Sequence, residues 1–356
     1  MSRRGANEYY NESNNAKIGK KSKKKWSKKK KVLVTILVIL LILVLIALGG
    51  YLYAKHKLGF MNYSPIDDKD LAVNSDLYNQ SNTDLTKDQF NNVKNIVLFG
   101  SDSRDLSDMS EGRSDTIVIT SINPTKKSLK LISIPRDTYV SIAGHGKTKI
   151  NAAYAYGQEK LAISTINSNF GLNLDKYITI NFSGLIDVID KIGGVTVTID
   201  KDEMNYINDG VRSWTDTGSS SKATLSKYGT VTLNGKQALI YSRNRTTGNG
   251  NDFQRANRQR TVIEAILSKV SKMPYDKVLS LSDSILKDVK TNITSDEYIA
   301  LLASVFKDKD EYLKNVISAQ VPSTDYAKGQ MIGGIYYFVP DMDKSKADFV
   351  EYMYNK

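Results

Sequence analysis

The run at residues 95–100 (NIVLFG) is followed by 116–120 (TIVIT) and 129–134 (LKLISI). All three runs are short and rich in β-branched and other apolar residues, which is typical of strands buried in a sheet. Asn123-Pro124 forms a turn signal between the second and third runs. The simplest arrangement in chain order is an antiparallel meander of three strands.

Predicted helices and strands alternate after this meander. We expect helices over 151–170 and 184–192 and strands over 177–182 and 195–199. The polar stretch 201–228 is expected to be a loop insertion, and 316–321 with 331–339 a late hairpin. This alternation predicts the α/β or α+β class, with a mixed central β-sheet flanked by helices.

The composition limits the chemistry and the partners of the chain. Its 356 residues include no cysteine and two histidines, which excludes disulfide scaffolds, cysteine zinc sites and thiol catalysis. Of the net charge of +12, residues 1–31 carry +10, and the other 325 residues are nearly neutral at +2. Residues 1–31 therefore read as a disordered basic tail, and the remainder offers little charge for nucleic acid.

The segment after the tail is long and apolar. Residues 32–54 (VLVTILVILLILVLIALGGYLYA) contain no charged residue and are long enough for a bilayer core of about 30 Å. A cleaved signal peptide is the alternative, but its apolar core is shorter, about 7–15 residues. We expect one transmembrane signal-anchor helix with a cytoplasmic N-terminus, because the lysines precede it. Residues 55–92 then form an extracellular stalk or accessory segment, and 93–350 a single extracellular domain.

Charged residues stand where the three predicted strands meet one edge of the sheet. Asp102 follows the first strand, Arg113 and Asp115 open the second, and Arg136-Asp137 follow the third. In an antiparallel meander these three points share an edge. We therefore expect carboxylates and guanidinium groups to converge there.

A second polar group lies further along the chain. Arg243 and Arg245 would point the same way in an extended segment and form a paired fork. On a helix beginning near Asp252, positions 252, 255 and 259 fall within about 60° of one another. Val262, Ile263, Ile266 and Val270 continue this stripe. The core-facing stripe thus begins with Asp252, Arg255 and Gln259, which must pair with each other or line a pocket.

Two readings of these groups are open. Each Arg–Asp pair could be a structural salt bridge. Taken together, however, arginines match phosphate oxygens bidentately, and a pair of aspartates is the oxygen donor set that Mg²⁺ prefers. An arginine-lined pocket with a divalent cation is suited to a pyrophosphate.

Several ordered motifs in residues 93–270 resemble those of the LytR-CpsA-Psr family. They are GSDSR (100–104), GRSDTIVI (112–119), SIPRD (133–137), KINAAYAYG (149–157), LIDVIDKIGGV (185–195), LNGKQALIYSRNR (233–245) and DFQRANRQ (252–259). The single N-terminal anchor is also typical of that family. The resemblance implies an α/β/α sandwich as the catalytic domain.

The resemblance implies a membrane-anchored phosphotransferase of the Gram-positive cell envelope. Such an enzyme takes an anionic glycopolymer (wall teichoic acid, capsular or related polysaccharide) from a polyprenyl-pyrophosphate carrier and joins it to peptidoglycan through a phosphodiester at muramic acid. By this resemblance Asp102 and Asp115 hold Mg²⁺ or Mn²⁺, and Asp252 orients arginines or acts as the base. The pyrophosphate is bound by Arg113, Arg136, Arg243, Arg245 and Arg255, with a hydrogen bond from Gln259.

Two other functions compete with this one. A polyprenyl-pyrophosphate hydrolase or lipid-binding envelope protein would use the same pocket without an acceptor. A membrane-bound transcriptional regulator would need the large domain in the cytoplasm and a basic surface, which its net charge of +2 disfavours. The polymer, the residues along the lipid tail and the oligomeric state are not encoded in any motif that we can read.

Overall fold

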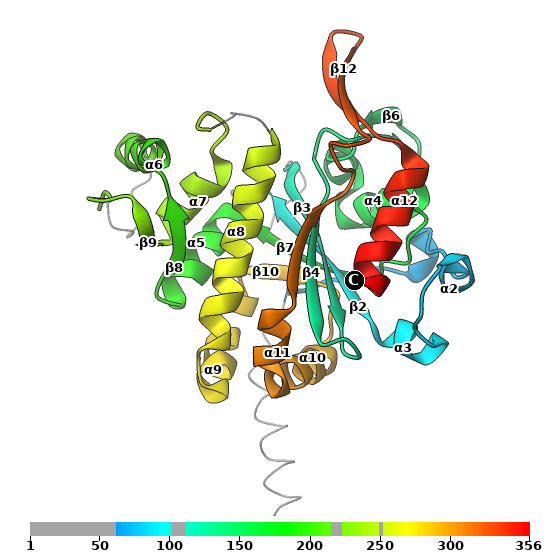
Figure 1. Cartoon of the computed structure of the whole chain (residues 1–356), viewed down its shortest axis with the longest axis horizontal. Helices are drawn as coiled ribbons and strands as arrows, with labels where there is room; N and C mark the ends of the chain where they lie inside the picture. Colours follow the sequence, from blue (N-terminus) through cyan, green and yellow to red (C-terminus); the bar gives the residue numbers. More distant parts are fainter. Residues whose placement is uncertain (1–61, 102–111, 215–222, 249–251) are drawn as a thin grey trace, which may run out of the picture. The chain divides into compact units, whose positions relative to one another are not determined.

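A mixed seven-stranded sheet forms the centre of the residues that the computed structural model describes, 62–101, 112–214, 223–248 and 252–356. The strand order is β1-β10-β7-β2-β3-β4-β11. Figure 1 shows β4 of this sheet between α8 on one side and α4 and α12 on the other. The strands are β1 (Asn62–Tyr63), β2 (Lys94–Ser101), β3 (Ser114–Asn123), β4 (Ser128–Ser133), β7 (Lys176–Asn181), β10 (Val289–Thr291) and β11 (Val316–Gln320). The predicted mixed sheet flanked by helices is confirmed.

The predicted meander is also confirmed. β2 pairs antiparallel with β3, and β3 pairs antiparallel with β4. Ser101 at the end of β2 is aligned both with Ser114 at the start of β3 and with Asn181 at the end of the parallel strand β7. These three points define one edge of the sheet, which we call the site edge.

One face of the sheet is covered by α4, α12 and the short helix η3. Their bounds are Ala152–Phe170, Met342–Val350 and Glu351–Asn355. Ile119 and Ile132 from the sheet are fully buried against this layer, together with Ile163 of α4 and Phe349 of α12. Successive residues of a strand point to opposite faces of the sheet. Each strand therefore contributes side chains to two cores, one on each face.

The opposite face is covered by α8 and the helices that follow it. Ile122 and Leu129 of the sheet pack there with Leu267 of α8 and Tyr312 of α11. The helices of this layer are α8 (Asp252–Ser271), α9 (Tyr275–Leu286), α10 (Ser295–Lys307) and α11 (Lys309–Lys314). The sheet is therefore the middle of three layers.

A second core lies beside the site edge. The two-stranded sheet of β8 and β9 packs with α5, α6, α7 and α8, burying Val197, Ile207, Leu233 and Val262. The elements are α5 (Phe182–Lys191), β8 (Val195–Ile199), α6 (Lys201–Ser213), β9 (Gly229–Leu233) and α7 (Gly235–Arg243). The strand predicted over 195–199 is confirmed, but it belongs to this small sheet.

The expected loop over 201–228 is wrong for its first half, which is the helix α6. Asp200 and Glu203 form a capping box at its start, and each accepts a hydrogen bond from the other's backbone N–H. Ile207 and Val211 are buried one turn apart. The helix was hidden by its many polar residues, because only a narrow stripe of it faces the core.

The expected late hairpin of 316–321 with 331–339 is wrong in its pairing, because 331–339 itself contains the turn of the hairpin. The hairpin joins β12 (Lys328–Ile332) to β13 (Ile335–Val339). β11 instead pairs parallel with β4 at the edge of the large sheet. The turn Gly333-Gly334, with positive φ at both residues, closes the hairpin as a two-residue loop.

The residues before β2 share the main core. Leu71, Leu77 and Phe90, from the segment expected to be a stalk or accessory segment, are buried with the α4 layer, and β1 pairs with β10. Among the described helices, none combines the length and hydropathy that a bilayer span requires. The expected basic tail (1–31) and membrane helix (32–54) lie outside the described residues. The other described elements are η2 (Asp68–Asp70), α2 (Leu77–Gln80), α3 (Lys87–Asn92), β5 (Tyr139–Ile142) and β6 (Gly146–Lys149).

Candidate active site

A cavity of about 710 Å³ opens beside the site edge. The sheet contributes Gly100 of β2, Asp115 and Thr116 of β3, and Ile180 and Asn181 of β7 to its lining. The helices α5, α6, α7 and α8 and the segments directly after α6 and α7 supply the rest. Its charged residues are Asp115, Asp209, Arg243, Arg245 and Arg255. Four of these five were predicted from the sequence as site residues, so the two separate motif groups do meet in space.

Asp115 is the point where three arginines from different parts of the chain meet. Arg136 donates a hydrogen bond from Nη1 to Asp115 Oδ1 at 2.7 Å. Arg245 Nη2 and Arg255 Nη1 lie 3.8 Å and 3.9 Å from Asp115 Oδ2. The expected convergence of carboxylate and guanidinium groups is therefore present at this end of the cavity.

Burial raises the pKa of Asp115, but the charge and hydrogen bond of Arg136, with the charges of Arg255 and Arg245, outweigh it and lower the pKa overall. The carboxylate is thus ionised at any pH near neutrality. The ionised Asp115 offsets part of the charge of the three guanidinium groups, so the cluster keeps a modest net positive charge. Such a cluster suits a ligand with several negative charges.

This lowered pKa predicts a pH dependence of stability. The folded-state pKa lies below the unfolded value, so the ionised Asp115 stabilises the fold above about pH 4, and this contribution is lost as the pH falls through the folded-state pKa. We expect the free energy of unfolding of the wild type to fall more steeply from about pH 5 to about pH 3 than that of Asp115→Asn. Urea unfolding at each pH measures both slopes, and equal slopes would contradict the prediction.

Arg136 is held from both sides. Its Nε lies 3.7 Å from Asp137 Oδ2, and Lys149 Nζ lies 2.6 Å from Asp137 Oδ1. Asp137 is almost fully buried, and the backbone N–H of Asn151 donates to the carbonyl of Arg136. Lys149, on β6, was not among the predicted site residues. The fold of the β5–β6 hairpin brings it to Asp137, and no local pattern in the sequence predicts that contact.

Arg243 and Arg245 line the cavity but do not form the parallel fork that an extended segment would give. Arg243 is the last residue of α7, and its guanidinium group lies over the ring of Phe182, 4.6 Å from the ring centroid. Arg245 instead faces Asp115. The segment was expected to be extended, but Arg243 ends a helix, so the two side chains leave the backbone in different directions toward one cavity.

The polar start of the α8 stripe is confirmed for Arg255 and Gln259. Arg255 is only 3% exposed, and both Arg255 and Gln259 line the cavity one turn apart. The stripe then continues into the second core through Val262, with Ile266 and Val270 partly buried. The same helix face thus turns from a pocket wall into a core surface.

The remaining predicted residues are placed differently. Arg113, directly before β3, is exposed and does not line the cavity as far as the structure describes the chain. Asp102 lies outside the described residues, one position after Ser101. Asp252 is the first residue of α8, but its side chain is not described. Their roles stay predictions.

Apolar side chains also line the cavity. They come from α5, α6, α7, the residue directly after α6 and the end of β7, and we call this set the apolar slot. The slot is lined by Ile180, Phe182, Leu185, Tyr206, Trp214, Leu239 and Ile240, with Gly210 and Ser213 beside them. No local sequence signal marks these residues, because they come from separate elements and look like ordinary core positions.

The described part of the site offers the type of ligand that a divalent cation prefers, but fewer ligands than a complete metal site. The described residues contain no group of three or more His, Asp or Glu side chains that could hold a metal ion. Asp115 offers an ionised carboxylate, and its Oδ2 lies farther than hydrogen-bond length from Arg245 and Arg255. One hard oxygen donor of this kind is compatible with Mg²⁺, which keeps several waters and takes oxygens from a bound phosphate.

The chain is similar to proteins of known family. The LytR_cpsA_psr family model matches residues 61–352. The Bacillus anthracis protein named polyisoprenyl-teichoic acid–peptidoglycan teichoic acid transferase TagU is 32% identical over 307 residues, covering 84% of this chain and 90% of TagU.

Solved structures agree. A structure of Bacillus subtilis TagT superposes with a TM-score of 0.58 at 27% identity, covering 75% of this chain and 93% of TagT. The structure of YwtF (TagT) with bound octaprenyl pyrophosphate lipid gives a TM-score of 0.56 at 26% identity, covering 75% of this chain and 92% of that one. The match of family model, relatives and fold over the same residues shows that this chain belongs to the LytR-CpsA-Psr family.

Proposed function

We propose that this protein is a glycopolymer–peptidoglycan phosphotransferase that uses a polyprenyl-pyrophosphate-linked glycan as donor. The observation that carries the proposal is one cavity lined both by residues of the Arg–Asp cluster and by the apolar slot. A lipid pyrophosphate combines the same two kinds of group, an anionic head and an apolar tail. The name of the TagU relative and the octaprenyl pyrophosphate in the YwtF structure support this choice of donor.

The arginines bind and orient the pyrophosphate. Arg136, Arg245 and Arg255 surround Asp115, and Arg243 and Gln259 border the same space. Phosphoryl transfer needs mainly positioning and stabilisation of charge on the phosphate oxygens. Guanidinium groups supply both, because their planar donors match two phosphate oxygens at once.

The transfer proceeds as one displacement. The 6-hydroxyl oxygen of muramic acid attacks the glycan-side phosphorus, and a new P–O bond forms. The bond from that phosphorus to the bridging oxygen breaks, and polyprenyl phosphate leaves with the electron pair. Asp252, at the start of α8, is our assignment for the carboxylate that takes the hydroxyl proton or orients the arginines beside it.

Asp115, with Asp102, would hold the divalent cation, Mg²⁺ or Mn²⁺. When bound, this cation neutralises charge on the pyrophosphate and its leaving group. The neighbouring arginines keep Asp115 ionised, and Arg136 is held between the carboxylates of Asp115 and Asp137.

The cellular arrangement follows from the sequence. We propose that residues 32–54 anchor the chain in the membrane, with the N-terminus in the cytoplasm and the catalytic domain outside, within reach of a lipid-linked donor and peptidoglycan. Protease treatment of wall-stripped cells tests this topology. Digestion of the large domain is expected, and its full protection would contradict the proposal.

The transfer itself is tested with and without an acceptor. The purified full chain is incubated with a lipid-pyrophosphate-linked glycan and Mg²⁺, and products are analysed by mass spectrometry. We expect a phosphodiester between glycan and peptidoglycan oligomer that forms only when the oligomer is present. Equal donor breakdown without an acceptor, with no phosphodiester, would indicate the competing hydrolase.

Narrowing the apolar slot should act on long donors alone. Ser213 lines the slot at the end of α6 and is exposed, so Ser213→Phe adds a larger side chain to the slot without replacing a buried residue. We expect KM for a long polyprenyl donor to rise about tenfold, because burial of a few methylene groups is lost at about 0.8 kcal/mol each. For a donor with only two isoprene units, KM should rise less than about threefold, because less of its tail lies in the slot. If both donors are affected equally, the tail does not occupy the slot.

A further inference from the structure

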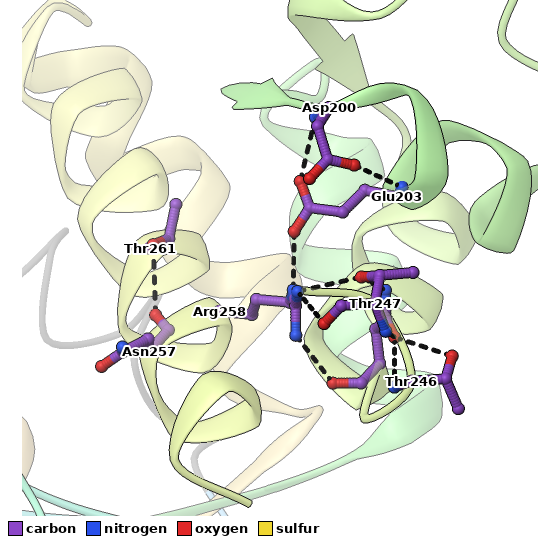
Figure 2. A network of polar contacts seen from close by, with 8 residues as sticks. Asp200, Glu203, Thr246, Thr247, Asn257, Arg258 and Thr261 are labelled. Atoms are coloured by element: carbon purple, nitrogen blue, oxygen red, sulfur yellow. Dashed lines mark hydrogen bonds and ion pairs between the residues drawn. The ribbon is translucent and has the colours of Figure 1, made fainter. Parts of the chain in front are cut away.

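Arg258 is buried on α8 one turn after Arg255, but it does not line the cavity. Its guanidinium group makes four hydrogen bonds (Figure 2). Nε donates to Glu203 Oε1 at 2.7 Å, and Nη1 donates to the carbonyl of Asn244 at 3.1 Å. Nη2 donates to the carbonyl and the hydroxyl of Thr247 at 3.2 Å and 3.0 Å.

The segment that Arg258 binds carries the cavity arginines. Asn244 stands between Arg243 and Arg245 and is fully buried. Its side-chain oxygen accepts hydrogen bonds from the backbone of Thr246 and Thr247, and its side-chain nitrogen donates to the Thr247 hydroxyl at 2.7 Å. Residues 244–247 therefore form a folded turn, and Arg258 holds that turn by both of its ends.

Glu203 ties the same guanidinium group to α6. One of its carboxylate oxygens accepts from the backbone N–H of Asp200 in the capping box, and the other accepts from Arg258 (Figure 2). α6 supplies Tyr206 and Gly210 to the apolar slot. The slot wall, α8 and the arginine turn thus meet at one buried ion pair.

We propose that Arg258, held by Glu203, is a positioning residue that fixes Arg243 and Arg245 for the pyrophosphate. Arg245 has an exposed, long side chain, so its place at the phosphate depends on a fixed backbone. The three nitrogens of the guanidinium group lie apart in one plane, and each reaches a different acceptor. A lysine ammonium group also has three donors, but all of them leave a single nitrogen, so it cannot reproduce this fork. This role rests on the proposed phosphotransferase function.

The first test replaces Arg258 with Lys in the full chain. This change keeps the charge beside Glu203 but removes the fork. We expect kcat for glycan transfer to fall about 10- to 100-fold, as small displacements of positioning groups do. Glu203→Gln keeps an oxygen that can accept the capping hydrogen bond but loses the charge beside Arg258, so its kcat should also fall. Arg260→Lys is the matched control, because Arg260 is also buried on α8 but donates to Ser133 and Asn257, and it should stay within about twofold of wild type.

A double-mutant cycle separates positioning from general stability. If Arg258 acts through Arg245, the loss from Arg258→Lys should shrink at least about fivefold in an Arg245→Ala background. Losses that simply multiply would overturn the role, and so would full activity of Arg258→Lys. Binding of polyprenyl pyrophosphate by the wild type is measured in parallel. Wild-type protein that neither binds nor transfers would overturn the proposed function and this role with it, whereas a fully active Arg258→Lys variant of a transferring wild type overturns this role alone.

Discussion

Asp115→Asn is expected to lower the rate of glycan transfer about 100- to 1,000-fold while the protein stays folded. Removal of one preorganised electrostatic group from an active site typically has an effect of that size. Here the carboxylate organises three guanidinium groups, through Arg136 at 2.7 Å and through Arg245 and Arg255 at 3.8 Å and 3.9 Å. Asn keeps the shape but loses the charge, so the arginines repel one another and the cation loses an ionised ligand.

The measurement is kcat/KM with a lipid-linked donor, beside a thermal unfolding curve. Asp276→Asn is the matched control, since Asp276 is an exposed carboxylate in the first turn of α9. The control should keep full activity. Transfer by Asp115→Asn within about threefold of wild type would remove Asp115 from the mechanism.

Arg255→Gln should cause a loss of similar size. Arg255 is 3% exposed, lines the cavity and lies beside Asp115, so its charge acts where water is largely excluded. We expect kcat/KM to fall about 100- to 1,000-fold for Gln. Lys, which keeps a point charge without the fork, should lose less, about 10- to 100-fold.

The order of these two losses is the informative result. Lys344→Gln serves as the control, because Lys344 on α12 is exposed, pairs with Asp341 on the helix surface and does not line the cavity. It should remain within about twofold of wild type. If Arg255→Lys keeps full activity, the reaction needs only a positive charge at this position and not a bidentate contact with the phosphate.

Local patterns predicted the part of the site that depends on periodicity. Strand alternation and chain order placed Asp115 and Arg136 at one edge, and the helical repeat placed Arg255 and Gln259 on one face. Both predictions need only the direction of a side chain along a regular element. The extended fork at Arg243 failed, because the end of a helix depends on capping by its surroundings.

Contacts between distant segments were beyond the sequence. β11 pairs with β4 across some 180 residues, and no local pattern specifies a parallel partner. The apolar slot draws on four elements, each of which reads as ordinary core. Arg258 was not singled out from the sequence, because its partner Glu203 lies 55 residues away on a helix that was expected to be loop. The Asp200–Glu203 capping signature was the one signal that could have revealed that helix.

The fate of the glycan-side phosphorus tests the central claim most directly. A donor labelled with radioactive phosphorus at that position is incubated with the purified full chain and peptidoglycan oligomers, and a second donor carries the label on the lipid side. The account predicts that the glycan-side label enters the peptidoglycan product and that the lipid-side label leaves as polyprenyl phosphate. Glycan-side label that stays with the lipid, or that is released as a free phosphorylated glycan despite the acceptor, would contradict it.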